Sequence, residues 1–296
     1  MIIVRLQGGL GNQMFQYAFG KAYSILNNVE LKFDITHLTA KYRSKRKIFR
    51  TYDLDIFDLD IKLAKKSEIL KYTIPRINNK YIYHTLNFIY KSKNFIEEKT
   101  PFNFNDYYLK LGDNKYFSGY WQSYKYFSII NNFLKEKFRI KYTIQQNSEY
   151  LLQKIQESNS ICLNYRRTDY INDKLLNTLV GEKGREYYNN AINYITSKVT
   201  NPIFFVFSDD IEWCKKNVNL DFEKVFVEHE HSGIKYSNYF LLMYNCKHFI
   251  IPNSTFAWWA AWLSENENKI VIAPKRWVNF GSFNPDDLFP VEWYII

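Results

Sequence analysis

The sequence predicts an α/β protein built on parallel β-sheets. Three observations lead to this prediction: a strand–turn–helix–strand opening, short apolar strands alternating with helices in the second half, and polar residues directly after each strand. Strands that are apolar along their whole length are buried on both faces, as in doubly wound sheets. A chain of 296 residues can form one large domain or two of about 150 residues each.

The N-terminal segment has the pattern of a β-α-β unit. Residues 2–6 are apolar and mostly β-branched apart from Arg5, which predicts a strand, and residues 8–12 form a glycine-rich turn. Apolar residues at helical spacing predict a helix from 13 to 26, and residues 31–34 predict a second strand. Such a unit implies a parallel sheet with a right-handed crossover.

The remaining elements follow from apolar runs and their spacing. Residues 60–115 are rich in Lys, Asn and Tyr and give no clear assignment, whereas 116–121 are expected to re-enter the sheet and 123–137 to form a charged helix. In the second half, strands are predicted at 161–165, 203–207, 225–227, 249–251 and 270–272. Helices are predicted at 185–198, 210–217, 236–246 and 254–263.

Composition narrows the functional classes. The formal net charge of +10 suits a Lys-rich surface, an anionic ligand, an anionic membrane face or nucleic acid. The densest basic run, residues 41–47, comes without a nucleic-acid-binding motif, so we expect no nucleic-acid partner. That run would suit peripheral contact with anionic phospholipid, or simply an exposed loop. We expect neither a secretory signal nor a membrane span.

Cysteine usage points to a reducing compartment. The three cysteines, Cys162, Cys214 and Cys246, are scattered in apolar contexts and lack metal-binding spacing. We interpret them as reduced core thiols of a cytoplasmic protein.

Polar residues gather where the predicted strands end. In open parallel sheets, ligands bind beyond the carboxyl ends of the strands. The segments found there are Gly8-Gly9-Leu10-Gly11-Asn12-Gln13, Arg166-Arg167-Thr168-Asp169, Ser208-Asp209-Asp210, Glu228-His229-Glu230-His231-Ser232 and Asn253-Ser254-Thr255. The glycine segment leads into a helix and could admit an anion to the backbone, or could be a plain tight turn.

The two adjacent arginines indicate phosphate binding. Neighbouring guanidinium groups repel unless an anion or carboxylates neutralise them, and Arg suits bidentate phosphate contact. The structural alternative pairs one arginine with Asp169 or Asp209 and leaves the other solvated. Asn253-Ser254-Thr255 is typical of a helix N-cap, which leaves spare N–H groups for a phosphate.

Two acidic segments have structural and functional interpretations. Ser208-Asp209-Asp210 can cap a helix, hold Mg²⁺, or contact a ribose or base edge. His229 and His231 flank Glu230, but no third ligand at metal spacing is visible, so a surface loop is favoured over a metal site.

Four blocks, in order, resemble glycosyltransferase family 11, the α-1,2-fucosyltransferases. They are Gly8 to Ala18, Gly119-Tyr120-Trp121-Gln122-Ser123 with Lys125-Tyr126-Phe127, Ser208-Asp209-Asp210 with Trp213-Cys214, and Asn253 to Trp259. The basic motif of that family, His-x-Arg-Arg-x-Asp, is matched by residues 164–169 except that Asn164 replaces the His. An acid that the family carries before the Asn-Ser-Thr block is absent around Asn238.

The resemblance implies a GT-B-like fold of two Rossmann-like lobes with parallel sheets and an interlobe cleft. Residues 1–145 would form the acceptor-side lobe with the glycine loop, and 146–296 the nucleotide-sugar-binding lobe. The implied reaction is inverting transfer of L-fucose from GDP-L-fucose to a terminal galactose in α-1,2 linkage, with no obligatory metal. The implied acceptor is a surface-glycan or O-antigen precursor, often lipid-linked, at the inner face of the membrane.

Roles for individual residues follow as hypotheses. Arg166 is expected to stabilise the departing diphosphate and Asp169 to act as general base, with Asp209, Asp210 and Glu230 as competitors. Asp209 is also expected to bind guanine. The donor-binding set is Gly9, Gly11, Asn12, Gln13, Arg166, Arg167, Ser208, Asp209, Asn253, Ser254, Thr255 and Phe256.

Two alternatives to fucosyl transfer remain at this point. The replacement at Asn164 leaves room for another GDP-6-deoxy-sugar donor, such as colitose. A different class is a non-catalytic basic protein at the membrane surface, which would have no need of polar residues confined to strand ends.

Overall fold

The computed structural model describes residues 1–39, 50–73, 92–168, 177–178, 180–281 and 283–296. The chain divides into two units, the first being Met1–Asp55 with Leu59–Lys137, and the second Ile56–Asp58 with Phe138–Ile296. The basic run 41–47 and Asp169 lie outside the described residues. No helix in the described part of the chain is long and apolar enough to cross a membrane.

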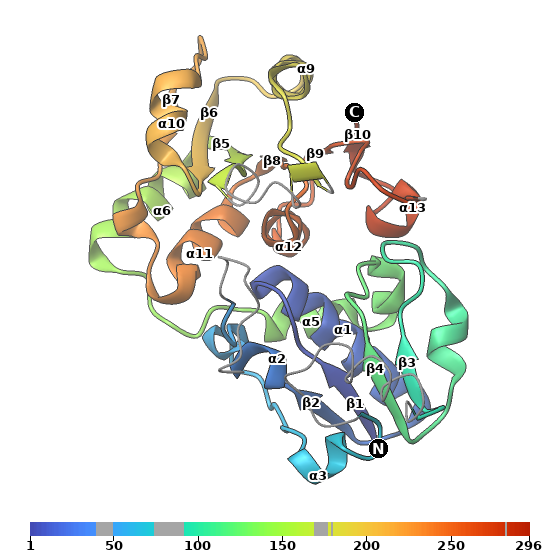
Figure 1. The fold of residues 1–296 in the computed structure, drawn as a ribbon. Helices are drawn as coiled ribbons and strands as arrows, with labels where there is room; N and C mark the ends of the chain where they lie inside the picture. The colour runs from blue at the N-terminus through green and yellow to red at the C-terminus, as the bar shows by residue number, and fades with distance from the viewer. Residues whose placement is uncertain (40–49, 74–91, 169–176, 179, 282) are drawn as a thin grey trace. The chain divides into compact units, whose positions relative to one another are not determined.

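The first unit is built on a four-stranded parallel sheet in the order β2-β1-β4-β3. Ile2 pairs with Leu31 on one side and with Lys115 on the other, which places β1 in the middle (Figure 1). The strands are β1 (Ile2–Arg5), β2 (Leu31–Asp34), β3 (Phe95–Glu97) and β4 (Lys115–Ser118). The helices are α1 (Leu10–Asn27), α2 (Thr36–Thr39), α3 (Lys66–Ile69) and α5 (Asn131–Lys137), with short 3-10 turns at η1 (Leu54–Ile56), η2 (Asp106–Lys110), η3 (Tyr124–Tyr126) and η4 (Ser128–Ile130).

Two elements of this unit differ from the sequence prediction. Helix α1 begins at Leu10, so Gly11, Asn12 and Gln13 lie in its first turn rather than in a loop. The charged helix expected over 123–137 is limited to α5, because two 3-10 turns precede it and the Ser123 side chain caps the first of them. Strand β3 lies in the stretch that the sequence left unassigned.

Aromatic rings form much of the core of the first unit. Phe19 of α1 stacks on Trp121 with ring centroids 4.2 Å apart, and Phe117, Tyr108 and Tyr126 meet the indole edge-on. Trp121 is fully buried although its φ is +54°, a conformation that is costly for a bulky residue. The surrounding contacts must therefore hold this residue in place.

The second unit is built on a six-stranded parallel sheet in the order β10-β9-β8-β5-β6-β7. Its strands are β5 (Asn159–Tyr165), β6 (Pro202–Ser208), β7 (Lys224–Phe226), β8 (His248–Ile250), β9 (Val271–Ala273) and β10 (Tyr294–Ile295). Its helices are α6 (Glu149–Glu157), α9 (Arg185–Thr196), α10 (Ile211–Asn217), α11 (Ser237–Asn245), α12 (Thr255–Leu263) and α13 (Pro285–Leu288), with 3-10 turns η5 (Gln146–Ser148), η6 (His229–His231) and η7 (Ile234–Tyr236).

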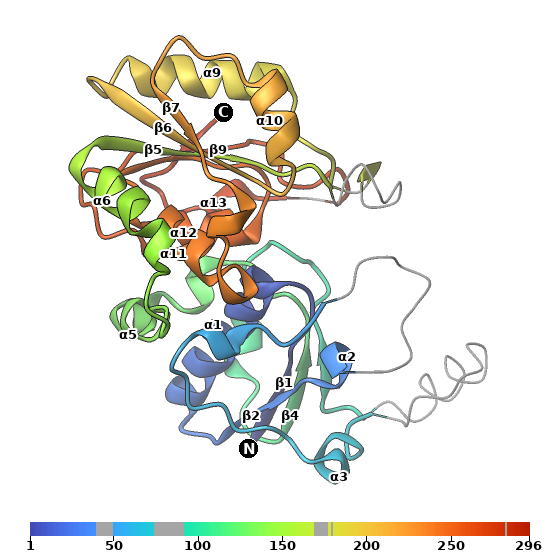
Figure 2. The same cartoon turned by 90° about the vertical axis from the view of Figure 1, so that its left-hand side faces the viewer.

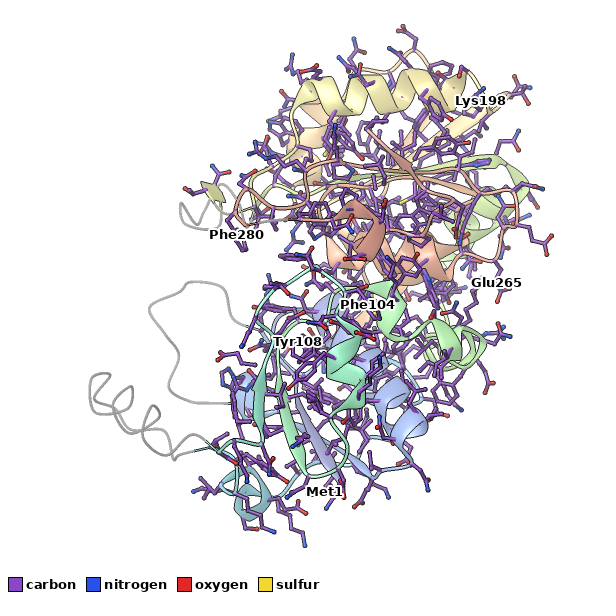
Figure 3. The ribbon with its side chains drawn as sticks, turned by 90° about the vertical axis from the view of Figure 1, so that its right-hand side faces the viewer. Met1, Phe104, Tyr108, Lys198, Glu265 and Phe280 are labelled. Carbon is purple, nitrogen blue, oxygen red and sulfur yellow. The ribbon has the colours of Figure 1, made fainter. Side chains whose placement is uncertain are left out.

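Helices cover both faces of this sheet. Helices α9 and α10 lie on one face, with α6, α11 and α12 on the other (Figure 2). Alternate residues of the central strand, Ile161 and Leu163, pack with α9 and α10 in one buried cluster. Side chains fill the space between α9 and the sheet (Figure 3). The prediction of an α/β fold with parallel sheets is confirmed.

The division of the chain falls at Lys137–Phe138, before the predicted boundary at 145. Phe138 packs against Phe57 and against Trp259 of α12, with ring centroids 5.1 Å apart in each case. These contacts assign the residues from Phe138 onward, and the short segment Ile56–Asp58, to the second unit. Sequence periodicity carries no signal for such long-range packing.

Candidate functional site

Three strands of the second unit, β5, β6 and β8, bring predicted site residues to one edge. Because β5 pairs in parallel with β6 and β8, and β8 pairs with β9, their carboxyl ends lie side by side. Tyr165 is level with Ser208, so the arginines that follow β5 face the acids that follow β6. The segment from Asn253 follows β8 at the same edge.

Asp209 holds the segment Arg166-Arg167-Thr168 after β5, which is called the arginine loop from here on. Its Oδ1 accepts the backbone N–H of Arg167 at 2.9 Å, and its Oδ2 accepts that of Thr168 at 3.2 Å. The same Oδ2 lies 3.3 Å from Nε of Arg166, and the Thr168 hydroxyl donates to the Asp209 carbonyl at 3.0 Å. Both carboxylate oxygens are thus engaged within the chain. The predicted contact of Asp209 with guanine stays a prediction.

Arg167 is fixed between an aromatic ring and two carboxylates. Its guanidinium lies 3.7 Å from the ring centre of Trp213, its Nη1 donates to Glu182 at 2.9 Å, and its Nε lies 3.6 Å from Asp210. Stacking and ion pairing of this kind favour Arg over Lys. The structural alternative is confirmed in pairing an arginine, Arg166, with Asp209, but it is wrong in leaving the other solvated, because Arg167 pairs with Glu182.

The turn after β6 is a helix cap. Asp210 is the N-cap of α10, where its Oδ1 accepts the Trp213 N–H at 3.2 Å. The Ser208 hydroxyl is buried and accepts the Asp210 N–H at 2.9 Å, and the Ser208 carbonyl contacts Nε2 of His229 at 3.0 Å. The cap interpretation is therefore confirmed for Asp210, and Ser208 stabilises the same turn. Donor contact by Ser208 stays a prediction.

Asn253 ties three segments together at this edge. Its buried Nδ2 donates to the carbonyl groups of Val180, Gly181 and Trp277 at 3.1, 2.9 and 3.2 Å. Ser254 follows as the N-cap of α12, and within the described residues its hydroxyl makes no capping hydrogen bond. The first N–H groups of this nine-residue helix are thus not capped by the residue expected to cap them.

Thr255 and Phe256 form the first turn of α12, and both are partly exposed. Phe256 packs edge-on against Phe240 of α11, with ring centroids 5.0 Å apart. This contact gives the phenyl ring a packing role. Its predicted contact with the donor stays a prediction.

The glycine segment of the first unit is a tight turn that starts a helix. Gly8 has a φ of +79°, and Gly9 is the N-cap of α1. Gln13 is fully buried: its Nε2 donates to the carbonyl groups of Gly8 and Thr51, and its Oε1 accepts the Asp53 N–H. The amide of Gln13 therefore has a structural role. The side chain is not exposed in this structure, so it could not make the predicted ligand contact in this conformation.

Asn12 and Gly11 lie in the first turn of α1. The Oδ1 of Asn12 accepts the Gln122 Nε2 at 2.7 Å, which links the glycine segment to the block at residues 119–123. Gln16 reaches the same block, since its Nε2 donates to the Gly119 carbonyl at 3.1 Å. Two of the segments that resemble a family signature are thus in direct contact within this unit.

Comparison with protein families gives the identity of the chain. The model for glycosyl transferase family 11 matches residues 1–296. The chain belongs to this family. It is therefore a glycosyltransferase, and the resemblance drawn from its four sequence blocks is confirmed.

Curated relatives cover nearly the whole chain. An alpha-1,2-colitosyltransferase of Escherichia coli is 34% identical over 297 residues, covering 99% of this chain and 98% of its own. The O-antigen biosynthesis glycosyltransferase WbnK of Escherichia coli is 29% identical, covering 97% and 98%. The galactoside 2-alpha-L-fucosyltransferase Sec1 of Mus musculus is 24% identical, covering 99% and 73%. Among solved structures, the NodZ alpha-1,6-fucosyltransferase co-crystallized with GDP matches with a TM-score of 0.49 at 11% identity, covering 88% and 91%.

In this family 11 transferase, the unusual Asn164 is a packed residue of β5. Its Nδ2 donates to the Phe207 carbonyl at 3.1 Å, and its own carbonyl accepts the Tyr188 hydroxyl at 3.0 Å. The side chain is nearly buried. The replacement is therefore accommodated by contacts within the second unit, and its bearing on the donor stays a prediction.

The His229–His231 segment is only partly the expected surface loop. Its Glu230 is exposed, but His231 is buried and its Nδ1 lies 3.0 Å from the hydroxyl of Ser148. The surface prediction is therefore wrong for His231, because a residue distant in sequence buries it. Over the described ranges, no group of three or more His, Cys, Asp or Glu side chains is arranged to hold a metal ion.

Sequence reasoning missed Glu98, a buried acid of the first unit. Its carboxylate accepts the backbone N–H of Tyr120 at 2.6 Å and that of Trp121 at 3.1 Å. Burial raises the pKa of Glu98, and the two N–H bonds partly oppose that rise. The acid therefore holds the block at residues 119–123, including Trp121 with its positive φ. No signal could have revealed it, since residue 98 lies in the stretch without clear periodicity.

Proposed function

We propose that this protein transfers a 6-deoxy-sugar, with inversion, from a GDP-sugar to a terminal galactose in α-1,2 linkage. The observation that carries the proposal is the arginine pair Arg166–Arg167, oriented by Asp209 at the same sheet edge as the start of α12. A diphosphate leaving group needs positive charge and N–H donors placed before the reaction begins. Names of relatives that cover the whole chain support the sugar classes.

The catalytic residues are assigned as follows. Arg166 and the first N–H groups of α12 would stabilise the negative charge that grows on the diphosphate as the glycosidic bond breaks. Arg167, which is stacked on Trp213 and paired with Glu182, would orient the loop and add positive charge. Asp169, two residues further on, is proposed as the general base for the acceptor hydroxyl. No metal is needed in this scheme, because arginines and helix N–H groups supply the positive charge.

Two donors are in question. GDP-L-fucose follows from the resemblance to α-1,2-fucosyltransferases. GDP-colitose is favoured by the relative that is 34% identical over nearly the full length of both chains. Colitose is fucose without its 3-hydroxyl group, so discrimination rests on a contact to one hydroxyl. A site that hydrogen-bonds a substrate hydroxyl discriminates strongly against the analogue that lacks it.

The acceptor is proposed to be a galactose-terminated oligosaccharide of an O-antigen or related surface glycan, attached to a lipid carrier. One relative is named for O-antigen biosynthesis, which supports this proposal. The reaction would take place on the cytoplasmic side, and the net charge of +10 would favour peripheral contact with an anionic membrane.

The test of the diphosphate site is Arg166→Ala in the full chain. Loss of this contact should lower kcat/KM by about 100-fold or more and weaken GDP binding. Arg139→Ala is the matched control, because Arg139 lies in the same unit and pairs with Glu265 in an exposed ion pair of 3.1 Å. Arg166→Ala activity and GDP affinity within about tenfold of the wild type would contradict the assignment.

A donor panel decides between the two sugars. Purified protein is given GDP-L-fucose, GDP-colitose or another GDP-6-deoxy-sugar with a galactose-terminated acceptor, and the product linkage is read by NMR. Transfer of neither fucose nor colitose would contradict the proposal. Turnover should also persist in excess EDTA, whereas complete loss that Mg²⁺ or Mn²⁺ restores would refute the metal-independent scheme.

A further inference from the structure

Arg5, in the first unit, has a guanidinium group that a chain of hydrogen bonds holds in place. Its Nε donates to the hydroxyl of Tyr116 at 3.1 Å, and that hydroxyl donates to Oδ2 of Asp34 at 2.5 Å. Asp34 and Tyr116 are both buried. Burial raises the pKa of Tyr116, so its hydroxyl stays protonated and keeps donating to the carboxylate. The three side chains thus link β1, β2 and β4.

Two aromatic rings cover part of the same guanidinium group. Its central carbon lies 5.6 Å from the ring centre of Phe95 and 5.5 Å from that of Tyr116. The two rings are stacked on each other with centroids 5.1 Å apart. Arg5 is accordingly only partly exposed. Among the residues that the structure describes, neither of its Nη nitrogens has a hydrogen-bond partner, so these N–H groups are available to a ligand.

The positive charge of Arg5 is not neutralised by an ion pair within its unit. Every Asp and Glu of the first unit lies among the described residues, and none of them forms an ion pair with Arg5. Asp34 is linked to Arg5 only through Tyr116, and its Oδ1 is engaged by the Thr36 N–H at 2.8 Å. Charged groups that are largely buried are as a rule paired, because desolvation without a partner is costly. An anionic ligand would supply the partner that the unit does not.

The position of Arg5 suits ligand binding. It is the last residue of β1, which lies between β2 and β4 (Figure 1), and ligands of open parallel sheets bind beyond the carboxyl ends of the strands. The two Nη nitrogens form a planar fork of N–H donors that matches the paired oxygens of a carboxylate or phosphate. Because hydrogen bonds and rings already orient this fork, little conformational freedom is lost when a ligand binds.

We propose that Arg5 binds an anionic group of the acceptor, a carboxylate or a phosphate, through its two Nη nitrogens. The inference rests on the proposed function, with the first unit as the acceptor-side lobe, and it adds a chemical feature to that acceptor. Two sources carry such a group: an acidic sugar within the glycan, and the phosphate of a lipid carrier. Both present the same paired oxygens to the fork, and the experiment separates them.

The experiment compares three galactose-terminated acceptors with the full chain and the GDP-sugar that the donor panel selects. One is a neutral disaccharide glycoside, one carries a uronic acid as its second sugar, and one is the neutral disaccharide on a short alkyl diphosphate. For the wild type, the KM of a charged acceptor should lie about 10-fold or more below that of the neutral one, and added salt should reduce the difference. The charged acceptor that shows this preference identifies the source of the anion.

Three variants test whether Arg5 causes the preference. Arg5→Gln should raise the KM of the charged acceptor about 10- to 100-fold and leave kcat and the KM of the neutral acceptor within about twofold. Arg5→Lys should lie between the wild type and Arg5→Gln, because the charge stays but the fork is lost. Lys62→Gln is the matched control, since Lys62 is an exposed cation of the same unit that pairs with Glu30 at 3.6 Å, and it should follow the wild type.

Three outcomes would overturn the proposal while leaving the proposed function intact. They are equal wild-type KM values for all three acceptors, an Arg5→Gln variant that keeps the preference, and an Arg5→Gln variant that weakens the neutral acceptor as much as the charged one. The last result would assign Arg5 a structural role only, and a melting curve of each variant separates loss of folding from loss of binding. Calorimetric titration of the acceptors without donor gives the same comparison in the absence of transfer, so failure of the proposed function is seen separately.

Discussion

The role assigned to Asp209 leads to a quantitative prediction. Asp209→Ala removes the acceptor for two backbone N–H groups, those of Arg167 and Thr168, and the partner of the Arg166 guanidinium. Each N–H bond to a charged acceptor contributes about 1.5–3 kcal/mol. The loop lies at a sheet edge where water can replace part of that loss. We therefore expect the unfolding free energy to fall by about 2–4 kcal/mol.

The melting temperature converts this energy into a measurable shift. At an unfolding entropy of about 2.1 cal/mol/K per residue, 1 kcal/mol corresponds to roughly 1.5–2 °C in a chain of 296 residues, so Asp209→Ala should melt about 3–8 °C lower. Asp209→Asn keeps one acceptor oxygen and should lose about half as much. GDP affinity should fall about tenfold or more in the alanine variant, because the arginine loop loses its anchor.

The assay is thermal unfolding with and without GDP, followed by calorimetric titration. Glu212→Ala serves as the control, because Glu212 is an exposed acid of the same unit that pairs with Lys215 at the surface. Its melting temperature should not change measurably. If Asp209→Ala melted like this control and bound GDP within twofold of the wild type, the idea that Asp209 anchors the arginine loop would be refuted.

Two predictions concern the first unit. Burial raises the pKa of Glu98 above its ordinary 4.5, so this group supports folding most at low pH and loses that contribution as pH rises through the raised pKa. Glu98→Gln should remove this part of the pH dependence, as measured by urea unfolding at pH 5 and pH 8; an unchanged dependence would contradict the assignment. Gly119→Ala would place a Cβ 2.5 Å from the Glu98 Cβ, and it should cost about 2–4 kcal/mol in the same assay. Gly184→Ala, whose Cβ meets nothing within 4 Å, is the control, and equal effects of the two changes would contradict the packing argument.

Sequence periodicity predicted the strands that pass through the core. The apolar runs at 161–165 and 203–207 correspond to β5 and β6, and the run near the N-terminus corresponds to β1. Strands buried on both faces must be apolar throughout, so a continuous apolar run indicates a strand in the interior of a sheet. Strands β3 and β10 were missed, because short edge strands bury little and lack that signature.

The candidate site was predicted as a set of segments but not as a set of contacts. The rule that ligands bind at the carboxyl ends of parallel strands selected the arginine loop, the acid pair and the start of α12. The rule could not predict that the Asp209 carboxylate accepts the backbone N–H groups of residues 167 and 168, because these residues are 41 or more positions away in the sequence. Glu98 also escaped notice, because it lies in a stretch without clear periodicity and its partners, Tyr120 and Trp121, are 22 and 23 positions away.

The sequence by itself therefore determined the α/β class, the parallel sheets, the family and the segments that meet at the strand ends. These properties depend on local composition, on periodicity and on ordered motifs. The tertiary structure alone decided which of these polar groups hold the fold. Gln13 is a buried link to residues 51–53, and Asn164 is a packed residue of β5. Burial and charge at a position are set by the residues that fold against it, and most of these lie far away in the chain.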